Sequence, residues 1–107
     1  PIIVGGFGPR MAGIAGRHGD GFNTQAMHPK LAELARLGRD EHAKSGRNPA
    51  DFVMTVFAGL DDRWLDPTSR ARQHLERIDI ARLILLIEPP YDPDQIRQAG
   101  RMLTAQP

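Results

Sequence analysis

The chain repeats one pattern four times, in which a short apolar run is followed by a segment with helical periodicity. The runs begin near residues 2, 21, 52 and 81, which are spacings that suit strand–helix–strand crossovers. Some of the runs, such as 83–87, are continuous rather than alternating, as in strands covered on both faces. The pattern therefore predicts an α/β fold, (βα)4, with a parallel four-stranded sheet and alternating helices.

Turn and capping residues predict where each element begins and ends. We expect strands over 1–6, 20–24, 52–58 and 81–87, and helices from about residue 9, over 29–45, over 66–78 and from residue 92. Trp64 is expected in a polar loop, and Arg39 on the solvent side of its helix. The positions expected to be buried on the first and last helices are Met11, Ile14, Ala15, Ile96, Ala99 and Leu103.

The length of the chain suits one domain, residues 1–107, but not a complete (βα)8 barrel, which usually needs about 250 residues. The sheet is therefore expected to be either a small open sheet or half of a barrel, with two unpaired strand edges. Such edges invite self-association or binding of a missing N-terminal half-barrel.

Charge and residue usage exclude several classes of function. The 14 basic and 13 acidic residues are scattered, which gives no electrostatic case for a nucleic-acid or membrane-surface partner. The chain has no cysteine, so disulfides, thiol catalysis and cysteine-based metal sites are excluded. No signal peptide is visible, and we expect a cytoplasmic protein.

The most informative segment lies between the first strand and the first helix. Gly5, Gly6 and Gly8 would let backbone amides approach a ligand without an intervening Cβ atom. The helix N-terminus adds unpaired N–H groups and a positive dipole, and Arg10 a charge for a phosphate. The alternative is a tight turn with no ligand, because the pattern matches neither the P-loop nor the dinucleotide-binding motif.

The segment PIIVGGFGPRMAGIAGRHGDGFN resembles the characteristic motif of the luciferase-like monooxygenase superfamily, particularly its deazaflavin-dependent branch. Later blocks, such as SGRNP and FVMTVFAGL, match that family in order and style. The resemblance implies a TIM barrel that binds FMN or the deazaflavin coenzyme F-420 and catalyses hydride transfer or oxygenation. This chain is similar to the C-terminal half of such a barrel, with strands five to eight and their helices.

The resemblance also implies a set of cofactor-binding residues. The loop after the first strand would help to hold the cofactor phosphate, and the start of the second strand would lie near its ring. Gly19 and Phe22 depart from the alanine and tryptophan that are usual there. The implied residues are Gly5, Gly6, Phe7, Gly8, Pro9 and Arg10 in the loop, and Asp20, Gly21, Phe22 and Asn23 at the strand.

The expected function is the cofactor-phosphate-binding part of a flavin- or deazaflavin-dependent oxidoreductase or monooxygenase, inactive alone. Its catalytic residues are unknown, because most belong to the N-terminal half in this family. One alternative is a free-standing α/β module that binds a phosphorylated ligand without catalysis. Another is a stable remnant with no activity.

The remaining candidate residues carry weaker signals. His28, His42 and His74 show no metal-ligand spacing, so no metal site is expected, and the last two are expected on solvated helix faces. Met11, Met54 and Met102 are expected in the core. His18, Trp64 and Glu88 are each open to two interpretations, an ordinary structural position or a ligand contact.

Overall fold

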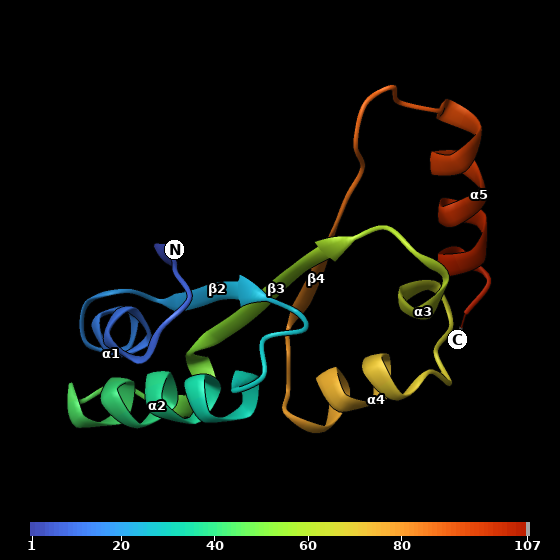
Figure 1. The fold of residues 1–107 in the computed structure, drawn as a ribbon. Helices are drawn as coiled ribbons and strands as arrows, with labels where there is room; N and C mark the ends of the chain where they lie inside the picture. Colours follow the sequence, from blue (N-terminus) through green and yellow to red (C-terminus); the bar gives the residue numbers. More distant parts are fainter. Residues whose placement is uncertain (107) are drawn as a thin grey trace.

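A computed structural model describes residues 1–106, and Pro107, the last residue of the expected domain, lies outside the described residues. The sheet has the order β1-β2-β3-β4, and each neighbouring pair of strands is parallel. This confirms the predicted α/β fold class, and the arrangement is consistent with a (βα)4 half-barrel (Figure 1). The strands are β1 (Ile3–Gly5), β2 (Gly21–Gln25), β3 (Val53–Gly59) and β4 (Arg82–Leu86).

The helices gather on one face of the sheet, except at the carboxyl-terminal end of the chain. In Figure 1, α1, α2 and α4 lie beneath the sheet, whereas α5 stands apart at the right. A short 3-10 turn, η1 (Pro49–Asp51), precedes β3. The helices are α1 (Pro9–His18), α2 (Leu31–Lys44), α3 (Asp62–Leu65), α4 (Arg70–Arg77) and α5 (Pro93–Thr104).

The core fills the space between the sheet and helices α1 and α2. Phe22 on β2 lies beside Met54 on β3, and both side chains are fully buried. Helices α1 and α2 approach closely at Gly16 and Gly38, because a Cβ atom on Gly16 would collide with the carbonyl oxygen of Gly38. Small residues at this crossing allow close packing, which buries Ala12 and Ala15 of α1.

Two arginines join the helices through backbone carbonyl groups. Arg47 donates to the carbonyl oxygens of Gly16 at 2.9 Å and Gly19 at 2.8 Å, at the C-terminal end of α1. Arg39 donates to those of Ile78 and Asp79, both at 3.0 Å, at the end of α4. A cation is favourable at a helix C-terminus. Arg39, which was expected to face solvent, is therefore half-buried, because its guanidinium caps a neighbouring helix.

Four residues that were predicted to be buried are exposed instead. Met11 on α1 and Met102 on α5 are exposed rather than buried. Ile96 and Leu103 are exposed as well, so Ala99 is the part of the predicted α5 stripe that is buried. The three exposed residues of α5 are explained by its position, because α5 packs beside α3 and stands away from the sheet (Figure 1).

Local polar contacts overturn three further predictions. His42 is buried, because its Nδ1 pairs with the carbonyl oxygen of Gly16 at 3.0 Å and its ring packs on Phe52. Trp64 lies in helix α3 rather than a loop. The next helix begins at Arg70, not near residue 66, because Asp66 accepts from the backbone N–H of Thr68 and forms a turn.

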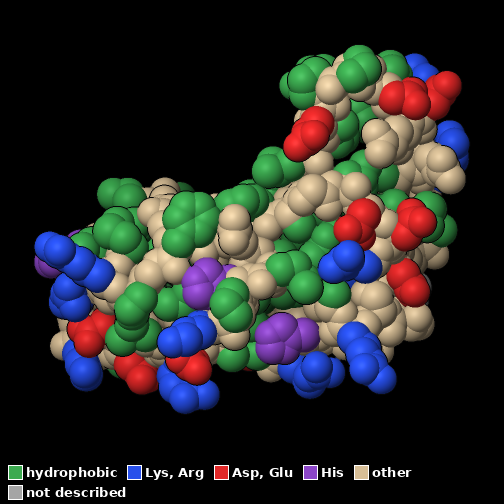
Figure 2. All heavy atoms as spheres, in the orientation of Figure 1, with side chains coloured by type: hydrophobic (Ala, Val, Ile, Leu, Met, Phe, Trp, Pro, Cys, Tyr) green, Lys and Arg blue, Asp and Glu red, His purple; other side chains and the backbone are tan. Residues whose placement is uncertain are grey.

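Within residues 1–106, no helix covers the other face of the sheet. Ile3, Ile84 and Leu86 are exposed on it, and Figure 2 shows apolar side chains on the side opposite α1 and α2. One row across this face is mostly polar, since Asn23 of β2 lies between Gly5 of β1 and Thr55 of β3. This uncovered surface, hereafter the open face, corresponds in a barrel to the interior.

Candidate functional site

The loop that follows β1 lies at the carboxyl edge of the sheet, where ligands of parallel α/β folds bind. The N–H of Gly6 donates to the carbonyl oxygen of Asn23 at 3.1 Å, which ties the loop to β2. Gly8 is the N-cap of α1 and makes no side-chain cap. The helical hydrogen bonds begin with the N–H of Ala12 to the carbonyl oxygen of Gly8. The first-turn N–H groups of Arg10 and Met11 therefore have no carbonyl partner one turn earlier.

The glycines of this loop differ in the space around them. A Cβ atom built on Gly5 or Gly8 would meet no heavy atom within 4 Å. On Gly6 it would lie 2.7 Å from the Cβ of Met11 and 3.3 Å from the ring of Phe22. Gly6 is therefore required for packing, whereas Gly5 and Gly8 border open space that a ligand can enter.

The residues predicted at the second strand lie in different surroundings. Asp20 precedes β2, at the amino edge of the sheet, and its Oδ2 accepts from the N–H of Ile2 at 2.6 Å. Gly21 lies against the backbone of Val53, and Phe22 is fully buried on the helix-covered face. Asn23 is on the open face, where its Oδ1 accepts from the hydroxyl of Thr55 at 2.7 Å. The structure thus brings Asn23 next to the glycine loop and leaves Asp20 at the opposite edge.

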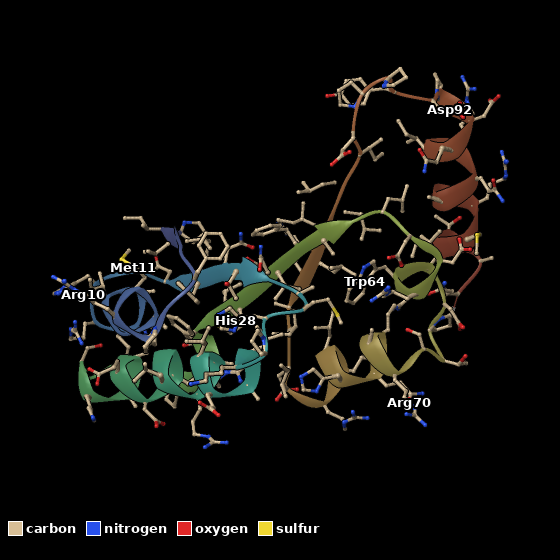
Figure 3. All side chains as sticks on the ribbon, viewed as in Figure 1. Arg10, Met11, His28, Trp64, Arg70 and Asp92 are labelled. Atoms are coloured by element: carbon tan, nitrogen blue, oxygen red, sulfur yellow. The ribbon has the colours of Figure 1, made fainter. Side chains whose placement is uncertain are left out.

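The rest of the predicted loop is exposed. Arg10 points outward from α1, away from His28 and Trp64 (Figure 3). Pro9 occupies the first helical position, where its missing N–H costs no hydrogen bond. The ring of Phe7 is 58% exposed and meets Phe57 of β3 edge-to-face, with ring centroids 6.4 Å apart. Phe7 therefore extends the loop over the ends of the neighbouring strands.

A pocket of about 700 Å³ lies at the carboxyl ends of β2, β3 and β4. The pocket is next to the glycine loop, because its wall residue Phe57 is the one that Phe7 contacts. Its lining mixes apolar, amide and charged side chains: Gln25, Met27, Phe57, Ala58, Gly59, Leu60, Asp61, Arg63, Trp64, Leu86, Ile87, Glu88 and Gln95. Such a mixture suits an organic ligand with both ring and polar groups.

Helix α3 positions the pocket wall. The Asp61 carboxylate caps α3 by accepting from the N–H of Arg63 at 2.9 Å, and it pairs with the Arg63 guanidinium at 3.2 Å. Trp64, in the next position, is 2% exposed and lines the pocket. Glu88 follows β4 and lines the same pocket with an exposed carboxylate. The structure therefore brings together Trp64 and Glu88, which the sequence could assess only one at a time.

Sequence reasoning missed several residues of this edge. Gln25, Met27 and Gln95 line the pocket but belong to no motif. His28 lies beside the glycine loop, with its Nε2 at 2.7 Å from the carbonyl oxygen of Phe7. The position of His28 in the sequence could have indicated this, because His28 follows the end of β2. Loops at the carboxyl ends of neighbouring parallel strands lie close together.

Residues 1–106 hold neither a cluster of metal ligands nor a membrane-spanning helix. Nowhere in this part of the chain do three His, Asp or Glu residues come together as a metal site. None of its helices is long and apolar enough to cross a bilayer.

Comparison with known proteins finds a sequence similarity to a reductase. No family model matches the chain. Over 85 residues it is 31% identical to the 5,10-methylenetetrahydromethanopterin reductase of Archaeoglobus fulgidus. The match covers 78% of this chain and 25% of the reductase, so the chain spans about a quarter of that curated relative. The similarity supports a relationship at the level of the luciferase-like superfamily that the sequence motif indicated.

Proposed function

We propose that this chain is the C-terminal cofactor-phosphate-binding part of a luciferase-like oxidoreductase. The observation that carries the proposal is the glycine loop, which borders open space at Gly5 and Gly8. The loop leads into the N-terminus of α1, where no side chain forms a capping hydrogen bond. Unpaired N–H groups at the first turn of a helix bind phosphate oxygens well. The adjacent pocket offers room for the rest of a coenzyme or for its substrate.

The coenzyme that we propose is the deazaflavin, with FMN as the comparator. Both are implied by the family resemblance, and the match to the archaeal reductase favours the deazaflavin. When bound, the deazaflavin supplies the hydride chemistry, while the protein supplies binding and orientation. Monooxygenase chemistry with FMN would be the corresponding activity if the preference were reversed.

The residues of the site have distinct tasks in this proposal. The backbone N–H groups of Gly8, Arg10 and Met11 bind the phosphate, and the exposed Arg10 side chain adds charge at the rim. Asn23, held by Thr55, faces the ring from the open face. Asp20, Gly21 and Phe22 have structural tasks. Asp20 and Gly21 hold β2 in place, and the ring of Phe22 packs beneath Gly6.

The open face needs a cover before such an enzyme can turn over. We propose that an N-terminal half-barrel covers it, as the family resemblance implies, and pairs with the free edges of β1 and β4. Exposed apolar side chains on this face, such as Ile84 and Leu86, support a buried role. Analytical ultracentrifugation distinguishes the occupants, because this chain alone stays monomeric under the proposal. A stable dimer would instead make a second copy the cover.

Fluorescence titration of the purified chain with the deazaflavin coenzyme tests the site. We expect saturable binding that is tighter than FMN binding, with no turnover. Gly8→Val places a branched side chain in the open space beside the loop, and its extended backbone (φ −130°) accepts any residue. We expect a loss of affinity of about tenfold or more, because losing one hydrogen bond to a charged group has at least this effect.

The matched control is Gly100→Val on α5. A Cβ atom at Gly100 also meets nothing within 4 Å, so this exchange should leave both folding and coenzyme affinity unchanged. Gly6 is unsuitable for the test because its substitution would disturb Met11. Wild-type affinity in folded Gly8→Val would place the binding site elsewhere.

A free-standing phosphate-binding module remains the second candidate function. It is favoured by the completeness of the loop, since β1, the loop and α1 all lie within this chain. Equal competition of the coenzyme by simple sugar phosphates would support this module over the coenzyme site.

A further inference from the structure

His28 makes a hydrogen bond through each of its ring nitrogens. Its Nδ1 lies 3.0 Å from the backbone nitrogen of Lys30 and accepts that N–H. A neutral imidazole carries its proton on the other nitrogen when Nδ1 accepts. The Nε2–H therefore donates to the carbonyl oxygen of Phe7, at 2.7 Å. His28 thus connects the loop after β2 to the glycine loop after β1.

This bond fixes a peptide unit of the proposed phosphate site. The carbonyl of Phe7 and the N–H of Gly8 belong to one planar trans peptide, so they point in opposite directions. Holding the Phe7 oxygen on His28 therefore also sets the direction of the Gly8 N–H. Across residues 1–106, no other side chain forms a hydrogen bond to the backbone of the segment 6–9.

The backbone of His28 is held by two hydrogen bonds of its own. Its backbone N–H donates to the carbonyl oxygen of Gln25 at 3.1 Å, and its own carbonyl accepts from Leu31 at 3.2 Å. The imidazole thus stands on a turn fixed between the end of β2 and the start of α2. Phe7 is held on its other side by the edge-to-face contact with Phe57. The glycine loop is therefore held by one side-chain hydrogen bond, from His28, and by one aromatic contact, with Phe57.

We propose that His28 is a positioning residue, which orients the Gly8 N–H toward a phosphate group of the coenzyme through its bond to Phe7. The proposal rests on the proposed function of the glycine loop. Its ligand is the phosphate of the deazaflavin coenzyme, and inorganic phosphate is the minimal probe of the same site. Without His28 the peptide between Phe7 and Gly8 turns more freely, and binding must then order it.

Two substitutions separate the two bonds of His28. In His28→Gln the side-chain amide can still donate to Phe7, but the acceptor for Lys30 is lost. In His28→Asn the side-chain oxygen can accept from the N–H of Lys30, two residues on, as in an Asx turn, but the side chain is too short to reach Phe7. Circular dichroism and thermal unfolding verify that both variants fold.

Coenzyme titration is the main readout. We expect His28→Gln to bind nearly as well as wild type, and His28→Asn to bind about tenfold more weakly, the effect of one lost orienting bond. Wild-type affinity in His28→Asn, or equal weakening in both variants, would overturn the positioning role. Absence of binding by the wild type would instead overturn the proposed function.

An NMR measurement without ligand keeps the two failures distinct. The amide signal of Gly8 should keep its position in His28→Gln and should shift or broaden in His28→Asn, since its peptide carries the Phe7 carbonyl. An unchanged Gly8 signal in His28→Asn would contradict the positioning role whether or not the coenzyme binds. Titration with inorganic phosphate then shows whether the same amide responds to the anion.

Discussion

The two ends of this chain follow the same strand–helix pattern but pack very differently. At one end, β2 and β3 are covered by α1 and α2, and side chains such as Phe22 and Met54 are fully buried. At the other end, Ile84 and Leu86 of β4 remain exposed, and so do Ile96 and Leu103 of α5. An apolar run followed by an amphipathic helix therefore does not guarantee a buried unit.

Neighbours explain the difference. Helices α1 and α2 cross at Gly16 and Gly38, and Arg47 holds the C-terminal end of α1. Helix α5 instead packs against α3, and Gln106 just beyond α5 donates to the carbonyl oxygen of Leu65 at 2.6 Å. A barrel unit is completed by the next unit along the ring, and β4 and α5 lack one. The exposed apolar side chains of α5 mark where that neighbour belongs.

The largest difference in stability is expected when one apolar side chain is replaced at each end of the chain. Phe22→Ala should lower the free energy of unfolding by about 3–5 kcal/mol, because it leaves a cavity in the core. Leu103→Ala on the exposed side of α5 should change it by less than about 0.5 kcal/mol. Urea unfolding followed by circular dichroism measures both. Similar losses would mean that α5 belongs to the same core.

A smaller effect is expected from one methyl group on each of two helical glycines. Gly16→Ala should destabilise the chain by about 1–3 kcal/mol, since its Cβ would collide with the backbone of α2. Gly100→Ala should stabilise it by up to about 1 kcal/mol, because nothing lies near the new atom and alanine favours a helix. Thermal unfolding at equal protein concentration gives both signs. A neutral Gly16→Ala would show that α1 and α2 are loosely packed.

The smallest effect concerns the surface link between α1 and α2. Burial pushes the pKa of Glu41 upward, but hydrogen bonds and charges from Arg17 and Lys44 outweigh it and hold the pKa below the ordinary value of 4.5. A carboxyl group with a lowered folded-state pKa stabilises the fold above its unfolded pKa. This contribution disappears as the pH falls through the folded value.

Glu41→Gln should therefore slightly lower the midpoint of unfolding at pH 7, and the difference should vanish in acid. Added salt should shrink the same difference, because the ion pairs are exposed. Unfolding midpoints measured from pH 7 to pH 3 test this. A difference that grows in acid would contradict the assigned pKa direction.

Much of the fold was predictable because it depends on local signals. The carboxylate of Asp92 caps α5 and Pro93 stands at its first position, as the sequence indicates. Gly46 adopts the left-handed conformation (φ 88°) that closes α2. The glycine loop follows the first strand, so its place at the carboxyl edge also follows from order alone.

Contacts between distant segments were not predictable in this way. His42 is buried through a carbonyl on another helix, and Arg39 is drawn to the end of α4. The direction of Phe22 depends on strand register, since a shift by one residue exchanges the two faces of a strand. The role of His28 depends on one carbonyl 21 residues away in the chain. Such information lies in the assembled sheet rather than in any motif.

An NMR titration shows directly whether the glycine loop of this chain is the coenzyme-phosphate site. Amide signals of the ¹⁵N-labelled chain would be followed while the deazaflavin coenzyme is added. We expect saturable shifts at Gly6, Gly8 and Arg10, with smaller shifts at Asn23. Shifts confined to helix α4, which contributes no residue to the glycine loop or the pocket, or no shifts at saturating coenzyme, would contradict this assignment.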